Sequence, residues 1–257
     1  MNLIIHPDAA SAANAAAAMM AQALAAHPRL VLGLATGGTV EPVYARLVEL
    51  HRQHSLDFSR CRTFNLDEYV GLPAHHRNSY RHFMNERLFL QVNLELANTH
   101  LPDGTAPDLS AECLRYESEI AASGGIDLQL LGIGQNGHIG FNEPGAELDS
   151  RTHVQTLSAT TRAQNSRLFT APDQMPAQAI TMGLGTIRDC RQCLLLATGR
   201  EKAGIIRQTL TSAPTPAIPA TVLHEHPDCT VILDAAAASQ LEGLQLPGVA
   251  LLTNQWK

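Results

Sequence analysis

The stretch RLVLGLATGGTVEPVYARLVELHRQH, residues 29–54, decides the fold class of this chain. It opens with a short apolar run typical of a buried strand. A glycine turn follows, and Pro42 then helps to start a longer amphipathic pattern typical of a helix. The stretch therefore predicts one strand, one turn and one helix in succession.

The same order recurs along the chain. Apolar runs precede turns and helical patterns in RCRTFNLDEY with NSYRHFMNERLFLQV (60–69, 78–92), IDLQLLGIGQNG (126–137), QCLLLATG with REKAGIIRQTL (192–199, 200–210) and CTVILD with AAAASQLEGL (229–234, 235–244). Alternating buried strands and helices indicate a parallel sheet covered on both faces. We predict an α/β, single-domain, Rossmann-like three-layer fold over residues 1–257, with a mainly parallel central sheet. Periodicity leaves residues 179–187, AITMGLGTI, ambiguous between strand and helix.

Composition narrows the class of protein. The chain has 257 residues, a formal net charge of -6 and a pI near 6.0, without a basic patch for nucleic acid. The alanine-rich residues 9–26 contain Ser, Asn and Gln and follow a predicted strand, so we expect a surface helix capped by Asp8 rather than a membrane segment. We predict a cytoplasmic protein that acts on a small molecule, with no nucleic-acid or membrane partner.

The cysteines and histidines do not form a recognisable metal or redox motif. Five cysteines are an odd set, which suits free thiols, and Cys190 and Cys193 run into an apolar strand instead of opening a helix. Neither HRQH (51–54) nor HEH (224–226) has the acidic or third-ligand context of a metal site. These residues therefore predict no metal site.

Two segments could bind or transform a ligand at the ends of predicted strands. In ATGGT (35–39), glycine N–H groups, threonine hydroxyls and the following helix N-terminus favour a phosphate, although a plain tight turn explains the same residues equally well. In NLDEYVGL (65–72), adjacent carboxylates on an extended backbone point to opposite sides. At most one of Asp67 and Glu68 should therefore face a ligand.

The segment GIGQNGHIGFNEP (132–144) fits the dinucleotide pattern G-x-G-x-x-G in spelling only. That pattern belongs in the first strand–helix unit and opens directly into a helix, whereas this one lies past the middle of the chain and is interrupted by Gly140 and Pro144. What remains is a glycine-rich loop carrying His138 and Glu143, a pair suited to proton transfer. A buried structural histidine is the competing interpretation.

Taken together and in this order, ATGGT, FNLDEYVGL, LGIGQNGHIGFNEPG, SRTHVQTL, TTRAQNSRLF, MGLGTI and LHEHPDCTVILD closely resemble the glucosamine-6-phosphate deaminase family. The related 6-phosphogluconolactonases share the architecture but tend to have DER-type and DGHTASLFP-type segments. The resemblance implies conversion of glucosamine 6-phosphate to fructose 6-phosphate and ammonium, without metal or organic cofactor.

The resemblance also implies a role for each candidate residue. Asp67 would be the base that moves a proton from C2 toward C1, and His138, with Glu143 and Asn136, would open the sugar ring. Gly37, Gly38 and Thr39 would hold the phosphate, with Arg167 and Lys202 neutralising it. A mobile lid at about residues 155–180 would carry Arg167 and exclude water.

Three positions depart from the family pattern. Asn136 stands where some members have aspartate, so we expect it to orient His138 without charging it, which leaves Glu143 as the only acid of the loop. Activated members carry basic residues where this chain has His153 and Gln155, so we expect weak or no activation by N-acetylglucosamine 6-phosphate. The family includes monomers and hexamers, which leaves a homo-oligomer open.

The sequence is also compatible with three alternative functions. The galactosamine epimer is an alternative substrate, and a 6-phosphogluconolactonase-like hydrolase would need no C2 base. A sugar-phosphate sensor of a transcription regulator would normally follow a DNA-binding segment, for which residues 1–29 offer only a strand and an alanine-rich helix.

Overall fold

The computed structural model describes the chain except for residues 55, 167–168, 170–174 and 253–257. Its centre is an eight-stranded sheet in which every pair of neighbours is parallel. The strands, in spatial order, are β11 (Ala250–Leu251), β1 (Asn2–His6), β10 (Cys229–Asp234), β9 (Gln192–Ala197), β6 (Leu128–Leu131), β2 (Val31–Leu34), β3 (Arg62–Asn65) and β5 (Thr99–His100). The predicted parallel sheet is confirmed.

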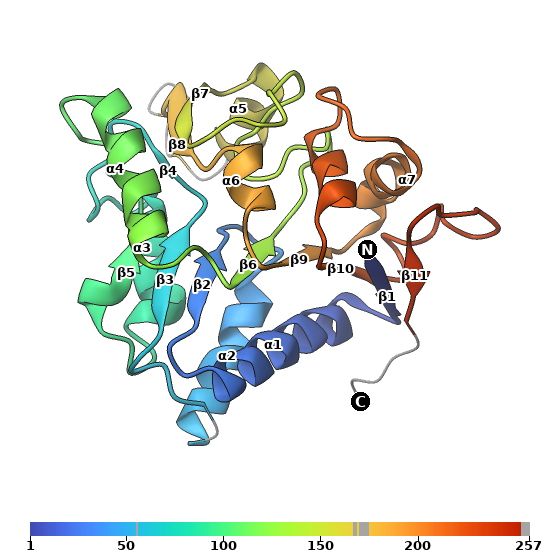
Figure 1. Cartoon of the computed structure of the whole chain (residues 1–257), viewed down its shortest axis with the longest axis horizontal. Coiled ribbons are helices and arrows are strands. Elements are labelled where there is room, and N and C mark those ends of the chain that lie inside the picture. Colours follow the sequence, from blue (N-terminus) through green and yellow to red (C-terminus); the bar gives the residue numbers. More distant parts are fainter. Residues whose placement is uncertain (55, 167–168, 170–174, 253–257) are drawn as a thin grey trace.

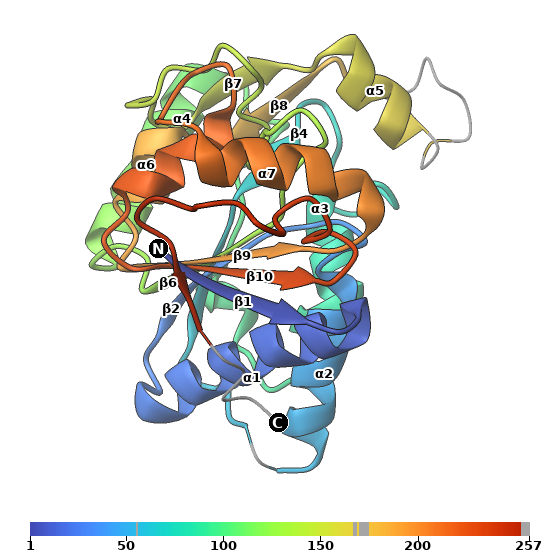
Figure 2. The same cartoon turned by 90° about the vertical axis from the view of Figure 1, so that its right-hand side faces the viewer.

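Helices cover both faces of this sheet. Figures 1 and 2 show α1 (Ala9–Ala26) and α2 (Glu41–Arg52) on one face, and α4 (Leu109–Ala122), α6 (Leu184–Arg188) and α7 (Ala203–Thr211) on the other. The short helical segments are α3 (Tyr80–Met84) with its π-helical continuation η1 (Asn85–Phe89), η2 (Leu96–Asn98), α5 (Ala159–Asn165), η5 (Arg200–Lys202) and η6 (Pro219–Glu225). The three-layer prediction is therefore confirmed as well.

The alanine-rich segment forms α1, as expected. The Asp8 carboxylate accepts a hydrogen bond of 2.7 Å from the backbone N–H of Ser11, which caps the helix. Ala12, Ala16 and Ala17 are fully buried, and small side chains allow the helix to lie close to β1 and β10. Among the residues that the structure describes, none of the helices combines the length and the apolar character needed to span a membrane.

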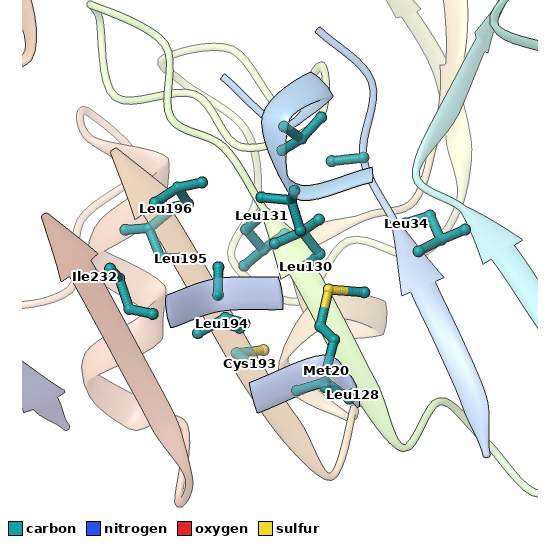
Figure 3. Close-up of a cluster of buried hydrophobic side chains, with 14 of the residues drawn as sticks. Met20, Leu34, Leu128, Leu130, Leu131, Cys193, Leu194, Leu195, Leu196 and Ile232 are labelled. Atoms are coloured by element: carbon teal, nitrogen blue, oxygen red, sulfur yellow. The ribbon is translucent and has the colours of Figure 1, made fainter. Parts of the chain in front are cut away.

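The hydrophobic core fills both spaces between sheet and helices. β9 is buried along nearly its whole length, which is expected of a central parallel strand covered on both faces. Figure 3 shows the side chains of Leu194 and Leu196 on β9 among those of β6 and β10, with Met20 of α1 packed beside them. This rigid centre fixes the ends of the strands from which the loops leave.

A second, three-stranded antiparallel sheet lies beyond the carboxyl ends of the main sheet. Its strands, in order, are β4 (Asp67–Tyr69), β8 (Gln178–Thr181) and β7 (His153–Thr156). The predicted single run RCRTFNLDEY is therefore divided, because the chain leaves the parallel sheet after Asn65 and enters the antiparallel one at Asp67. The ambiguous AITMGLGTI resolves into the end of β8 followed by α6.

One expected helix is wrong. The residues AAAASQLEGL after β10 form consecutive turns instead of a helix. The Asp234 carboxylate accepts the N–H of Ala237, after which Leu241 N–H bonds to the Ala238 carbonyl in a tighter turn and Gly243 takes a φ of 72°. The chain then returns to the main sheet as β11, which pairs with β1.

The cysteines and the histidines of HEH (224–226) have structural surroundings. All five cysteines are free and buried. His224 and His226 bond through Nε2 to the carbonyls of Thr209 and Cys190, which fixes η6 against its neighbours.

We expect Gly104→Ala to lower the free energy of unfolding by about 1 to 3 kcal/mol, because overpacking of a close contact costs that much. An added Cβ would lie 2.0 Å from the carbonyl oxygen of Tyr69 at the end of β4. Urea denaturation monitored by circular dichroism measures the change. Gly204→Ala in α7 is the matched control, because a Cβ there meets nothing within 4 Å and helix propensity should make the variant neutral or slightly more stable. Equal stability of the two variants would contradict the packing argument.

Candidate active site

Three loops gather at one edge of the main sheet because the strands before them are adjacent and parallel. β2 leads into residues 35–39, β6 into the loop from Gly132, and β9 into residues 198–202, and these strands are neighbours in the order β9–β6–β2. The carboxyl ends of such strands are the usual place for a ligand in an open α/β sheet. The loops singled out from the sequence therefore lie at one end of the fold.

Asp67 lies at the start of β4, beside this edge. Asp67 is buried, with only 6% of its surface exposed. It faces the glycine-rich loop, because a Cβ added at Gly140 would lie 3.6 Å from Asp67 Oδ2. Burial raises the pKa of the Asp67 carboxyl to about 8, and the charge of Glu68 adds to the rise. Asp67 is thus a carboxyl group that gives up its proton near neutral pH.

Glu68 points away from Asp67 and has a structural role. Its carboxylate accepts three backbone hydrogen bonds of 2.8 to 2.9 Å, from Tyr69, Tyr80 and Arg81. Tyr80 and Arg81 form the first turn of α3, where backbone N–H groups have no partner within the helix. The Glu68 carboxylate accepts hydrogen bonds from them. The expectation that the two neighbouring carboxylates face different partners is confirmed.

The loop from Gly134 to Glu143 depends on its glycines. At Gly134 an added Cβ would lie 2.2 Å from Cε1 of the His138 ring, so the ring packs directly on this backbone. Gly137 has a φ of 87°, and a Cβ there would lie 2.7 Å from Ile218. No helix follows among these residues, so the dinucleotide interpretation is excluded here by backbone conformation as well as by sequence context.

His138 and Glu143 lie close together in this loop. His138 Nδ1 lies 3.9 Å from Glu143 Oε2, and this nitrogen has no hydrogen-bond partner among the described residues. Burial lowers the pKa of His138, and the opposing effect of Glu143 is not large enough to reverse it, while Lys202 lowers it further. The arrangement holds a neutral imidazole, ready to exchange protons, beside a carboxylate.

Glu143 is kept ionised by its hydrogen bonds. Burial alone would raise its pKa, but hydrogen bonds from Thr161 and Asn136 and the charge of His138 bring the pKa below its ordinary value. Asn136 Nδ2 donates to Glu143 Oε2 at 2.8 Å, and Asn136 Oδ1 accepts the backbone N–H of His138 at 3.3 Å. The amide therefore orients the carboxylate and the loop backbone, and does not bond to the imidazole itself.

The residues expected to bind phosphate lie on two of the loops. Gly37 and Gly38 are exposed, Thr39 is half-buried, and added Cβ atoms at the two glycines would meet open space. Lys202 Nζ donates to the carbonyl of Ile133 at 2.7 Å, and burial lowers the pKa of this ammonium group. No hydrogen bond among the described residues joins Lys202 to residues 37–39. Arg167 lies outside the described residues.

Several residues near the site gave no functional signal in the sequence. Tyr69 and Tyr80 have ring centroids 4.8 Å apart, and both pack against Phe141 of the glycine-rich loop. Thr161, at the start of α5, donates its hydroxyl hydrogen to Glu143 Oε1. Ser158, three residues earlier, reads as a helix cap in the sequence, but no local pattern could connect Thr161 with Glu143.

Other expected features lie around this centre. His153 Nε2 and Gln155 Oε1 of β7 are 3.3 Å apart, so these two side chains contact each other. Residues 155–180 begin in β7 and end in β8, and part of this span lies outside the described residues. Within the described part of the chain, no group of three or more His, Cys, Asp or Glu side chains is arranged to hold a metal ion.

Comparison with known proteins relates the chain to one family. A sequence model of the family described as glucosamine-6-phosphate isomerases/6-phosphogluconolactonase matches residues 8–232. The glucosamine-6-phosphate deaminase of Shouchella clausii strain KSM-K16 is 48% identical over 239 residues, which are 93% of this chain and 97% of that protein. The enzyme of the same name from Rhodopirellula baltica is 48% identical over 238 residues, 93% of this chain and 95% of its own.

Solved structures agree with this relationship. A monomeric glucosamine-6-phosphate deaminase superposes with a TM-score of 0.92 at 44% identity, covering 93% of this chain and all of that one. The 6-phosphogluconolactonase of Trypanosoma brucei has a TM-score of 0.73 at 21% identity, covering 93% of this chain and 98% of that one, which shows a shared fold only.

The buried carboxyl of Asp67 predicts a pH-dependent gain in stability for Asp67→Asn. Because the folded-state pKa of Asp67 is raised to about 8, the folded protein holds a proton that the unfolded chain releases near pH 4. Wild-type stability from this group is therefore present below pH 4 and is lost as pH rises toward 8. We expect the stability of the variant relative to wild type to rise by about 3 to 4 kcal/mol between pH 5 and pH 8, because each pH unit between the two pKa values contributes about 1.4 kcal/mol.

Chemical denaturation at both pH values measures this difference. Glu147→Gln, at an exposed position, is the matched control and should leave the pH dependence unchanged. A stability difference between Asp67→Asn and wild type that is the same at pH 5 and pH 8 would refute the assignment of a raised pKa.

Proposed function

The chain belongs to the family of glucosamine-6-phosphate isomerases and 6-phosphogluconolactonases, and we propose that it is a glucosamine-6-phosphate deaminase, converting glucosamine 6-phosphate and water to fructose 6-phosphate and ammonium. The observation that carries this proposal is the buried Asp67 carboxyl facing the loop of His138 and Glu143. A base at C2 is needed for isomerisation, whereas hydrolysis of a lactone has no use for one. Close relatives named as deaminases support the same choice.

Ring opening is the first step, and we assign it to His138. The C1 hydroxyl gives up its proton and the ring oxygen gains one, so a single neutral imidazole can accept the first and return a proton to the second. Glu143 stabilises the imidazolium that forms in between, since its carboxylate lies 3.9 Å from Nδ1. Asn136 holds this carboxylate in place.

Isomerisation and deamination then follow at C2. Asp67 removes the C2 proton to give a cis-enolamine, and the proton is delivered to C1, which leaves an imine at C2. Water adds to this imine and releases ammonia, with the ketone of fructose 6-phosphate as product. The protonated amino group of the substrate brings a positive charge next to Asp67, which lowers the pKa of the carboxyl and favours its basic form. Besides these proton transfers, ring opening breaks the bond between C1 and the ring oxygen, and the bond between C2 and nitrogen breaks after water has added.

Phosphate binding is assigned to Gly37, Gly38, Thr39 and Lys202. The exposed glycines precede the N-terminus of α2, where free N–H groups favour an anion. Lys202 would turn from the Ile133 carbonyl toward the phosphate, and its low hydration in a half-buried position strengthens the interaction. The roles of Arg167 and of a moving lid at 155–180 stay predictions.

The cellular compartment, the regulation and the oligomeric state are also proposals. Free, buried thiols and a phosphorylated substrate are both typical of the cytoplasm. His153 and Gln155 carry no fixed positive charge, so we retain weak or absent activation by N-acetylglucosamine 6-phosphate as a prediction. A homo-oligomer is a prediction too, next to a solved relative described as monomeric.

The decisive assay is ammonia release from glucosamine 6-phosphate and, in parallel, from galactosamine 6-phosphate. We expect wild type to release ammonia with equimolar fructose 6-phosphate, and Asp67→Asn to lose at least about a hundredfold in kcat, because a positioned base typically contributes 10² to 10⁴. Glu147→Gln should retain wild-type kcat. Hydrolysis of 6-phosphogluconolactone without ammonia release would favour the lactonase, and near-normal turnover by Asp67→Asn would refute the role of Asp67.

Asn136→Asp tests why a neutral amide precedes His138. A second carboxylate 2.8 Å from Glu143 Oε2 would repel it, so one of the two acids would stay protonated to higher pH. We expect the acid limb of kcat/KM to move upward by about one pH unit, measured as the pH profile of ammonia release. Superimposable profiles of the variant and wild type would contradict this.

A further inference from the structure

Helix α5 forms hydrogen bonds with two parts of the candidate site, the glycine-rich loop and strand β4. Near its start, the buried Thr161 hydroxyl donates to Glu143 Oε1, and at its end Asn165 Nδ2 donates to the Tyr69 hydroxyl at 3.0 Å. Tyr69 belongs to β4, the strand that carries Asp67. One short helix therefore contacts the strand of the proposed base and the acid of the ring-opening pair.

The direction of the Thr161 hydroxyl is set by the turn that begins α5. Ser158 Oγ accepts the backbone N–H of Thr161 at 3.1 Å and donates to Thr161 Oγ1 at 3.1 Å. Because Thr161 Oγ1 already accepts this hydrogen, its own hydrogen is free for Glu143. Thr161 is 2% exposed, so water does not compete for the bond.

The two oxygens of Glu143 have separate partners. Oε1 accepts from Thr161, while Oε2 accepts from Asn136 and faces His138 Nδ1. A carboxylate can rotate about its last side-chain bond, and a donor on Oε1 from outside the loop limits this rotation. Without that donor, the Asn136 amide and the Ser158 hydroxyl would be left to hold the carboxylate.

We propose that Thr161 is a positioning residue of ring opening, whose hydroxyl holds the Glu143 carboxylate with Oε2 toward His138. The proposal rests on the proposed deaminase function. It also makes the acid–base pair dependent on α5 being in place, since the loop itself offers no equivalent donor to Oε1 among the described residues.

The charged groups around Glu143 do not replace this hydroxyl. His138 faces it from the same loop, Lys202 of η5 lowers the pKa of His138, and Asp67 of β4 lies near Gly140. From α5, Thr161 and Ser158 present uncharged hydroxyl groups. Loss of the Thr161 hydroxyl removes a hydrogen bond to the ionised form, so the pKa of Glu143 rises and a larger fraction of the carboxyl is neutral at low pH.

The test compares three substitutions on α5 in the full-length protein. Thr161→Val removes the hydroxyl at constant shape, Thr161→Ser retains it, and Thr160→Val makes the same change at the adjacent exposed position. In all three variants Ser158 can still accept the backbone N–H of residue 161, so the substitutions leave the N-terminal cap of the helix intact. Circular dichroism and thermal unfolding establish that each variant is folded.

We expect Thr161→Val to move the acid limb of the kcat/KM profile for ammonia release upward by about one pH unit. At the pH optimum kcat should fall about tenfold, with KM within about twofold, because the bond supports a proton-transfer step and not phosphate binding. Thr161→Ser and Thr160→Val should stay within about twofold of wild type, with unshifted profiles.

A Thr161→Val profile that superimposes on that of Thr160→Val overturns the proposal, and so does a Thr161→Ser variant as impaired as Thr161→Val. A wild type that releases no ammonia would refute the proposed function instead. In that case NMR titration of ¹³C-labelled glutamate, assigned with Glu143→Gln, decides the positioning directly. An unchanged Glu143 pKa in Thr161→Val then overturns it.

Discussion

Leu66 is the backbone position on which the site depends. Its N–H donates to the Leu34 carbonyl of β2 at 2.9 Å, and its carbonyl accepts the N–H of Met182 at 2.7 Å. It is thus the last residue bonded to the parallel sheet on one side and is tied to the end of β8 on the other. The next residue is Asp67. These two hydrogen bonds therefore fix the backbone that places its carboxyl group beside the loops at the carboxyl ends of the strands.

The buried ionisable groups of the site lower the stability of the fold, but their shifted pKa values suit them to proton transfer. Among the described residues Asp67 is buried without a positive partner, which raises its pKa to about 8, and His138 is buried so that its neutral form is preferred. In contrast, Glu143 has enough donors to remain charged. Groups of the same kind thus differ in basicity because their surroundings differ, which is how a protein separates acid from base near neutral pH.

The glycines of the loop from Gly134 to Glu143 illustrate how one pattern can arise from two causes. G-x-G-x-x-G in a nucleotide-binding protein brings the backbone close to a pyrophosphate, whereas Gly134 here makes room for the ring of His138 and Gly137 makes room for Ile218. Asn136 fits the same account, because its amide bonds to Glu143 and to the loop backbone. The loop is built to fix two side chains relative to each other.

The sequence by itself determined the alternation of strands and helices, the free cysteines and the position of each conspicuous loop at a strand end. These features follow from local periodicity and turn chemistry, and the motifs in order identified the family. Only the tertiary structure decided that RCRTFNLDEY divides between two sheets, that AAAASQLEGL forms turns, and that Thr161 reaches Glu143. These outcomes depend on hydrogen bonds between segments far apart in the chain, and no local pattern contains the partner.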